Sequence, residues 1–187
     1  VFTIESGEGN GTVIRDLVIT GGLASCGGEI FCSNSRPTIS NCAIANNAAA
    51  NQGGGIFCYY SIPTISGCTI EGNTANSSGG GIFSDYSDPE IINCTIKENA
   101  SGQYCGGIYC RGGISPTISG CLILNNTAFA AAGIGCDDSD ATISDCMIMD
   151  NTASYVVGGI ICQDSNATIT NCTIEGNTSD YGVGGIS

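Results

Sequence analysis

Short runs of alternating apolar and polar residues recur along the chain at an interval of 26 residues. One copy, Gly53 to Asn73, reads GGGIFCYYSIPTISGCTIEGN and contains three such runs, at 56–58, 63–66 and 68–71. The runs are strand-sized and rich in β-branched residues, and turn-forming residues separate them. No segment has an apolar stripe with a 3.6-residue period, so we expect strands and no helix.

A fixed period of this length is typical of a solenoid, in which each repeat forms one rung. Stacking places equivalent residues in columns about 4.8 Å apart. Three columns consist of isoleucine and are expected to fill the core: Ile30, Ile56, Ile82, Ile108, Ile134 and Ile160; Ile39, Ile65, Ile91, Ile118, Ile143 and Ile169; Ile44, Ile70, Ile96, Ile123, Ile148 and Ile174. The sequence therefore predicts an all-β parallel β-helix of about seven rungs, with three short strands in each rung.

The regular rungs occupy residues 29–187, which we expect to continue or to stack on another copy beyond residue 187. Residues 1–28 are interpreted as a degenerate first rung or a join to an upstream segment, because Ile14 and Ile19 match Ile39 and Ile44 at a spacing of 25. The fourth rung carries one extra residue. We place it in a turn, since a slip within a strand would turn its apolar side chains outward.

Asparagine occupies one turn column, and the interpretation is structural. Each amide is expected to hydrogen-bond to the adjacent rung, at a turn position that tolerates left-handed backbone angles. The column consists of Asn47, Asn73, Asn99, Asn126, Asn151 and Asn177.

Cysteine forms two further columns. The first is Cys42, Cys68, Cys94, Cys121, Cys146 and Cys172, and the second is Cys32, Cys58, Cys110, Cys136 and Cys162, with Ser84 replacing one member. One interpretation is that cysteine acts as a small buried apolar residue at tight corners. The alternative is a disulfide within each rung, such as Cys32 with Cys42 or Cys58 with Cys68. A metal or iron–sulfur role is disfavoured, because the chain has no histidine and no CxxC pair.

Alternation places the residue after each first isoleucine on the outer surface, which yields a stripe that begins Phe31, Phe57, Phe83, Tyr109. We predict that this stripe is a contact surface, for a packed loop, for another molecule or for a sugar. A second outer face repeats Thr-x-Ser, as at Thr64 and Ser66, and is similar to the arrays of ice-binding solenoids, although Glu90 and Ile92 interrupt it. Threonine and serine are also ordinary outward-facing strand residues.

Charge narrows the choice of partners. Four basic and 17 acidic residues yield a formal net charge of −13, which disfavours nucleic acid and anionic lipid surfaces. No run of 18 apolar residues occurs, so this segment is not expected to insert into a membrane.

Acidic residues gather in two turns and could hold Ca²⁺, namely Asp85, Asp88, Asp137, Asp138 and Asp140. The alternative is a solvated turn in which aspartate makes local hydrogen bonds. No other cofactor and no catalytic residue is predicted, because four scattered basic residues cannot form the convergent cluster that a polysaccharide lyase requires.

The Gly-Gly-Gly-Ile starts and the Thr-Ile-x-x-Asn ends, such as Thr69-Ile70 to Asn73, resemble the repeats of right-handed parallel β-helix proteins. They are also similar to the repeats of chlamydial polymorphic outer-membrane proteins, with isoleucine in place of phenylalanine. The resemblance implies an extracellular or cell-surface protein. We expect a non-catalytic structural or adhesive solenoid that acts as a surface stalk, or as a filament subunit that associates with its copies end to end or laterally. The alternatives are a carbohydrate-binding or polysaccharide-degrading β-helix and an ice-binding solenoid.

Overall fold

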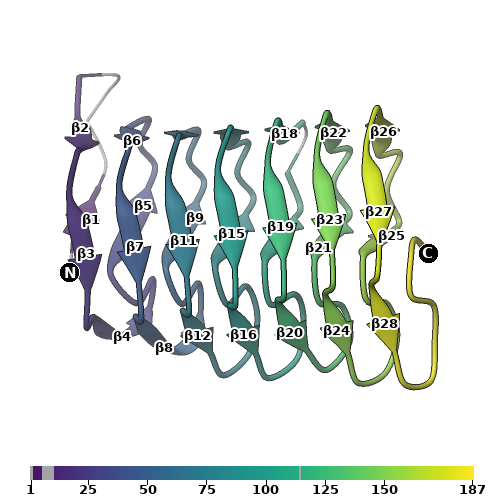
Figure 1. Ribbon diagram of the computed structural model, residues 1–187. Helices are drawn as coiled ribbons and strands as arrows, with labels where there is room; N and C mark the ends of the chain where they lie inside the picture. Colours follow the sequence, from purple (N-terminus) through teal and green to yellow (C-terminus); the bar gives the residue numbers. More distant parts are fainter. Residues whose placement is uncertain (1, 6–10, 114) are drawn as a thin grey trace.

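The computed structural model, which describes residues 2–5, 11–113 and 115–187, is a right-handed parallel β-solenoid of about seven rungs (Figure 1). The strands within these described ranges form four parallel sheets of seven strands each. In the view of Figure 1, sheet C lies at the front, sheet B along the top, sheet D along the bottom and sheet A behind. The described residues contain no helix that is long and apolar enough to cross a membrane.

The strands of each sheet are equivalent segments of successive rungs. Sheet A contains β1 (Phe2–Ile4), β5 (Ile30–Ser33), β9 (Ile56–Tyr59), β13 (Ile82–Asp85), β17 (Ile108–Arg111), β21 (Ile134–Asp137) and β25 (Ile160–Gln163). Sheet B contains β2 (Val13–Arg15), β6 (Thr38–Ser40), β10 (Thr64–Ser66), β14 (Glu90–Ile92), β18 (Thr117–Ser119), β22 (Thr142–Ser144) and β26 (Thr168–Thr170). Sheet C contains β3 (Val18–Thr20), β7 (Ala43–Ala45), β11 (Thr69–Glu71), β15 (Thr95–Lys97), β19 (Leu122–Leu124), β23 (Met147–Met149) and β27 (Thr173–Glu175).

Sheet D was not anticipated as a sheet. It lies in the segment that closes each rung, where the sequence indicates only turns, and it contains β4 (Leu23–Cys26), β8 (Ala48–Gln52), β12 (Thr74–Ala75), β16 (Ala100–Ser101), β20 (Thr127–Ala128), β24 (Thr152–Ala153) and β28 (Thr178–Ser179). Most of these strands have two residues, which is too short for alternation to be visible. Small inward side chains such as Ala75 and Ala153 are buried there.

The predicted isoleucine columns form the core. All members are fully buried except Ile169 and Ile174, which lie in the last rung and pack against the same cluster. The first rung pairs in register with the second, with Ile14 beside Ile39 and Ile19 beside Ile44, while Val1 and residues 6–10 lie outside the described residues. The extra residue of the fourth rung lies in the turn between β17 and β18, as expected.

All thirteen cysteines are free, so the alternative of disulfides within the rungs is wrong for this structure. Those of both columns are buried, apart from Cys162 and Cys172 near the C-terminal end. The first column also makes regular contacts with the main chain. The Sγ atom of Cys68 lies 3.4 Å from the carbonyl oxygen of Ser66 and 3.6 Å from that of Ile39 in the preceding rung. Cysteine thus serves as a small buried residue whose thiol satisfies a carbonyl at the corner.

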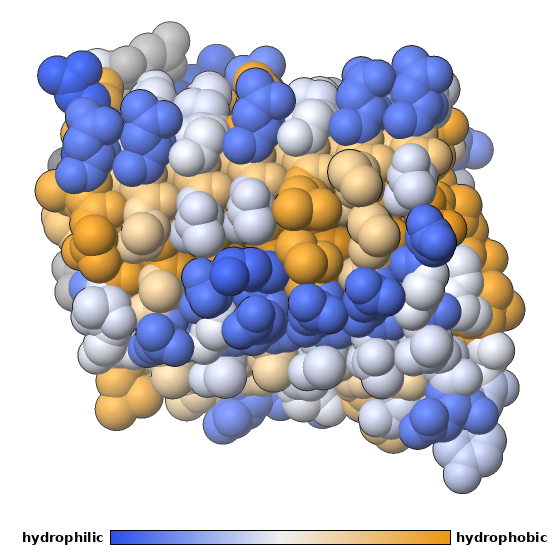
Figure 2. All heavy atoms as spheres, in the orientation of Figure 1, coloured by the Kyte–Doolittle hydropathy of each residue, from blue (hydrophilic) through white to orange (hydrophobic). Residues whose placement is uncertain are grey.

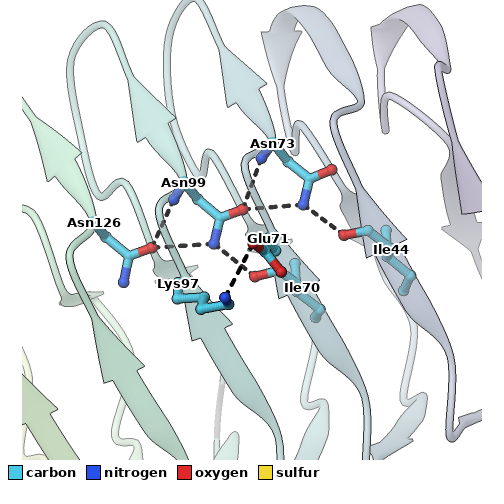
Figure 3. Close-up of polar contacts among 7 residues, drawn as sticks. All are labelled: Ile44, Ile70, Glu71, Asn73, Lys97, Asn99 and Asn126. Atoms are coloured by element: carbon cyan, nitrogen blue, oxygen red, sulfur yellow. Dashed lines mark hydrogen bonds and ion pairs between the residues drawn. The ribbon is translucent and has the colours of Figure 1, made fainter.

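The asparagine column is a continuous hydrogen-bonded ladder (Figure 3). The Oδ1 atom of Asn99 accepts hydrogen bonds from the backbone N–H and the Nδ2 of Asn73, both at 3.0 Å. The Nδ2 of Asn99 donates to the carbonyl of Ile70 and to Oδ1 of Asn126. Every hydrogen-bonding atom of this fully buried amide therefore has a partner.

One detail of the prediction for the asparagine column is wrong, namely its backbone angles. The ladder asparagines do not adopt left-handed angles, and the residue before each of them does, with φ values of 56° at Asn46, 62° at Gly72 and 56° at Glu98. The left-handed residue turns the chain, and the following asparagine then points its amide inward.

A candidate binding groove outside sheet A

The segment that closes each rung folds back over the outer face of sheet A. Consecutive rungs are bridged there through Gln52, Ser78, Tyr104, Ala131, Val157 and Val183. Glycine allows the reversal, because Gly53 has a φ of 65° and a Cβ atom on it would lie 2.6 Å from the carbonyl oxygen of Ile56 and 2.7 Å from Cβ of Phe57. The chain therefore passes directly over the start of strand β9.

This covering corrects the prediction of an exposed aromatic stripe. Phe83 is fully buried, Phe57 and Tyr109 are 7% and 6% exposed, and Phe31 is partly buried. Their rings stack along the rod at centroid distances of 5.2–5.4 Å. The stripe is a contact surface, as predicted, but the partner is the chain's own closing segment. Alternation indicates which side chains leave the core, and it does not indicate what covers them.

The ring stack ends at Tyr109, because the next position is Gly135. A side chain at Gly135 would overlap the Sγ atom of Cys105, which occupies that space. Cys105 itself is buried in a left-handed conformation with a φ of 53°, and burial raises the pKa of its thiol well above the ordinary value. Cys105 thus fills the place of an absent ring.

Next to the aromatic stripe, polar side chains at the ends of the sheet A strands contact one another in pairs. The Nε and Nη2 atoms of Arg111 each lie 2.9 Å from an oxygen of Asp85, whose side chain is 8% exposed, and the guanidinium lies 5.3 Å from the ring centre of Phe83. The hydroxyl of Tyr109 donates to Oδ2 of Asp137 at 2.8 Å. Burial raises the pKa of Tyr109, and the hydrogen bond to Asp137 raises it further.

The partners of the aspartates bear on the prediction that the acidic turns hold Ca²⁺. Asp85 and Asp137 are engaged as described, and the Oδ1 atoms of Asp88 and Asp140 each accept a backbone N–H at 2.7 Å, from Ser115 and Asn166. Within the described ranges no three or more acidic or cysteine side chains come together in a group that could hold a metal ion. Asp88 and Asp140 instead join successive turns, which favours the alternative considered for them, and Ca²⁺ binding at these turns, Asp138 included, stays a prediction.

Two adjoining hollows lie between the closing segments and the ends of the sheet A strands. The larger, about 500 Å³, is mainly apolar and is lined by Gln103, Tyr104, Phe129, Tyr155, Ile161 and Gln163 among others. The smaller, about 230 Å³, is polar and shares Gln103, Tyr104 and Gln163 with the first, and Ser78, Arg111 and Asp137 also line it. Because the hollows share three residues, they form one groove along the rod, with an aromatic and a polar section.

The aromatic residues of this groove were missed by the sequence reasoning. Phe129 and Tyr155 are 52% and 54% exposed, and their rings stack almost in parallel at 5.4 Å, followed by Tyr181 at 6.1 Å from Tyr155. The three residues are spaced by 26, so the signal was present in the sequence. It was overlooked because the closing segments were interpreted only as turns.

The Thr-x-Ser face is formed by sheet B. Thr64, Ser66 and their equivalents pair in register between neighbouring strands, and Glu90 and Ile92 interrupt the array on β14 as the sequence indicates. The Oγ1 atom of Thr64 donates to Glu90 Oε2 at 3.4 Å. Ice binding by this face stays a prediction.

Comparison with known proteins agrees with the fold. A family model described as a right-handed beta helix region matches residues 3–105 and 66–186. No curated protein and no solved structure matches the chain.

Proposed function

The chain belongs to the right-handed β-helix family, and from this premise we propose that it is a non-catalytic, extracellular adhesive solenoid whose groove outside sheet A binds a neutral carbohydrate chain. The observation that carries the proposal is the exposed, stacked pair of Phe129 and Tyr155 beside the groove.

The groove combines the two kinds of contact that a sugar needs. An aromatic ring offers an apolar face for the C–H side of a pyranose, while amides and hydroxyls bind its hydroxyl groups. Phe129 and Tyr155 supply the rings, and Gln103 and Gln163 supply amides shared by both hollows. Since these residues come from successive rungs, the groove follows the rod and suits an extended oligosaccharide.

Charge favours a neutral ligand. The chain carries a formal net charge of −13, which repels acidic polysaccharides. Arg111, which lines the polar hollow, is already held by both oxygens of Asp85. It is therefore not free to act as the main anchor for a carboxylate.

The non-catalytic part of the proposal is supported by how the carboxylates near the groove are used. Asp85 holds Arg111, and Asp137 accepts a hydrogen bond from Tyr109. A glycosidase needs two carboxyl groups that flank the scissile bond. Here both carboxylates stabilise the covering of sheet A instead, and the stacked rungs serve as a rigid stalk.

The test is binding of neutral oligosaccharides, screened on an array and then measured by calorimetry. We expect Tyr155→Ala to weaken the affinity about tenfold, which corresponds to about 1.4 kcal/mol, because it removes the exposed stacking face. Tyr60→Ala is the matched control, since Tyr60 is 50% exposed and stacks on Tyr86 at 5.1 Å but does not line the groove.

Equal losses in the two variants, or no neutral glycan bound by the unaltered protein, would contradict the carbohydrate proposal. Release of shorter sugars from a bound oligosaccharide would contradict the non-catalytic part alone.

A further inference from the structure

The outer face of sheet C carries an apolar patch that the groove does not involve. Figure 2 shows it near the middle of the face, in orange over strand β19 and in paler orange over β23. Leu122 and Leu124 of β19 lie beside Met147 and Met149 of β23, and all four side chains point outward and are at least partly exposed. A flat sheet surface of this kind normally faces water with polar residues.

The residues around the patch are arranged in a self-complementary order. Reading across the strands from β15 to β27, one row is Lys97, Leu124, Met149 and Glu175, and the other is Thr95, Leu122, Met147 and Thr173. Each row has two apolar residues in the middle. The first row ends in opposite charges and the second in two threonines.

We propose that this face pairs with the same face of a second copy of the chain, about a two-fold axis that runs parallel to the strands between β19 and β23. The axis reverses the order of the rungs. Leu124 then faces Met149 of the second copy, Leu122 faces its Met147, and Lys97 faces its Glu175. The contact is isologous, so each pair occurs twice.

The charges fix the register of this dimer. Moving the axis onto β19 would place Lys97 opposite Met149, and moving it onto β23 would place Glu175 opposite Leu124. The first shift would cover the Lys97–Glu71 ion pair with an apolar side chain, and the second would bury Glu175 without a partner; both desolvate charge at a cost. Only the axis between the two strands pairs apolar with apolar residues and lysine with glutamate.

The geometry within one copy is compatible with this pairing. Lys97 Nζ lies 3.0 Å from Glu71 Oε1 and its side chain is 30% exposed, so it can receive a second carboxylate (Figure 3). Two sheets that pack face to face lie about 10 Å apart, a distance that leucine and methionine side chains fill. Methionine adapts its shape readily and suits such a contact.

Sedimentation velocity across a concentration series tests the proposal. We expect a reversible dimer at micromolar concentrations, and Leu124→Thr should raise its dissociation constant at least tenfold while retaining a good strand residue. Ile92→Thr, which alters an outward residue of sheet B, is the control and should leave the dimer unchanged.

A charge exchange distinguishes this axis from any other contact. Lys97→Glu and Glu175→Lys should each weaken the dimer at least tenfold, and the double variant should restore it. The two residues are three rungs apart in one copy, about 14 Å, so rescue within a single copy is excluded. A monomer at all concentrations, a dimer insensitive to Leu124→Thr, or a double variant as weak as the single ones would overturn the proposal.

Discussion

Replacing Asn99 with alanine is expected to lower the free energy of unfolding by about 2–6 kcal/mol, since it orphans two buried groups and each costs about 1–3 kcal/mol. The substitution leaves the backbone N–H and one Nδ2 hydrogen of Asn73 without their acceptor. Both groups belong to a residue that is fully buried, where water cannot replace the lost partner. Equilibrium unfolding in urea measures the effect.

Two control substitutions separate the ladder from the turn around it. Asn125→Gly changes an exposed residue that already has a φ of 54°, and it should leave the stability within about 1 kcal/mol of the parent. Asn177→Ala should cost less than Asn99→Ala, because Asn177 is itself partly exposed and water can enter the space that its amide leaves beside Asn151. A loss below about 1 kcal/mol for Asn99→Ala would show that the ladder is not a main source of stability.

The core of this fold could be predicted because every rung repeats both the residue type and its spacing. Ile65 is interpretable on its own only as an apolar residue in a short strand. Its equivalents at intervals of 26 turn that observation into a column, and the polar residues that alternate with it on both sides in most rungs place the column inward. The same reasoning located the asparagine ladder and the buried cysteines.

The covering of sheet A could not be predicted in the same way. Alternation assigns Phe57 and Phe83 to the outer side of their strand, and that assignment is correct. Their burial depends on the path of the closing segment, which is set by a left-handed turn at Gly53 and by bridges between single residues such as Gln52 and Ser78. These are long-range backbone features with no periodic apolar signal.

The groove illustrates an intermediate case. The spacing of Phe129 and Tyr155 was visible in the sequence, and their exposure and stacking were not. The left-handed conformation of Glu98 is a second case that the sequence does not indicate. Glutamate rarely adopts this conformation, and here the stacked turns around it impose the angle. Sequence columns locate candidate residues, and the structure decides which of them are accessible.

The groove and the proposed dimer face lie on opposite sides of the rod, since sheet A lies behind sheet C in Figure 1. A dimer through sheet C would therefore present two grooves facing away from each other. Such an arrangement would allow one dimer to bridge two carbohydrate surfaces, without raising the affinity of either attachment.

High pH is expected to destabilise the fold through its buried thiols. Burial raises the pKa of the Cys110 thiol from 9.0 to about 12, with a smaller contribution from Asp88. Below pH 9 the thiol is neutral in both states and its contribution to stability is complete. Above pH 9 the unfolded chain loses this proton while the folded chain keeps it, so the free energy of unfolding falls by about 1.4 kcal/mol per pH unit, or about 4 kcal/mol by pH 12.

The matched variant for this effect is Cys110→Ser, because Ser84 occupies the same column in the neighbouring rung and donates to the carbonyl of Ser87 at 3.1 Å. Urea unfolding under reducing conditions at several pH values between 8 and 11 should show a slope that is about 1.4 kcal/mol per pH unit shallower in this variant. The variant should still show a considerable slope, since burial also raises the pKa of Cys105. An unchanged slope, or rapid alkylation of Cys110 in the folded protein at pH 8, would mean that this thiol ionises while buried, and the explanation of alkaline unfolding by buried thiols would then fail.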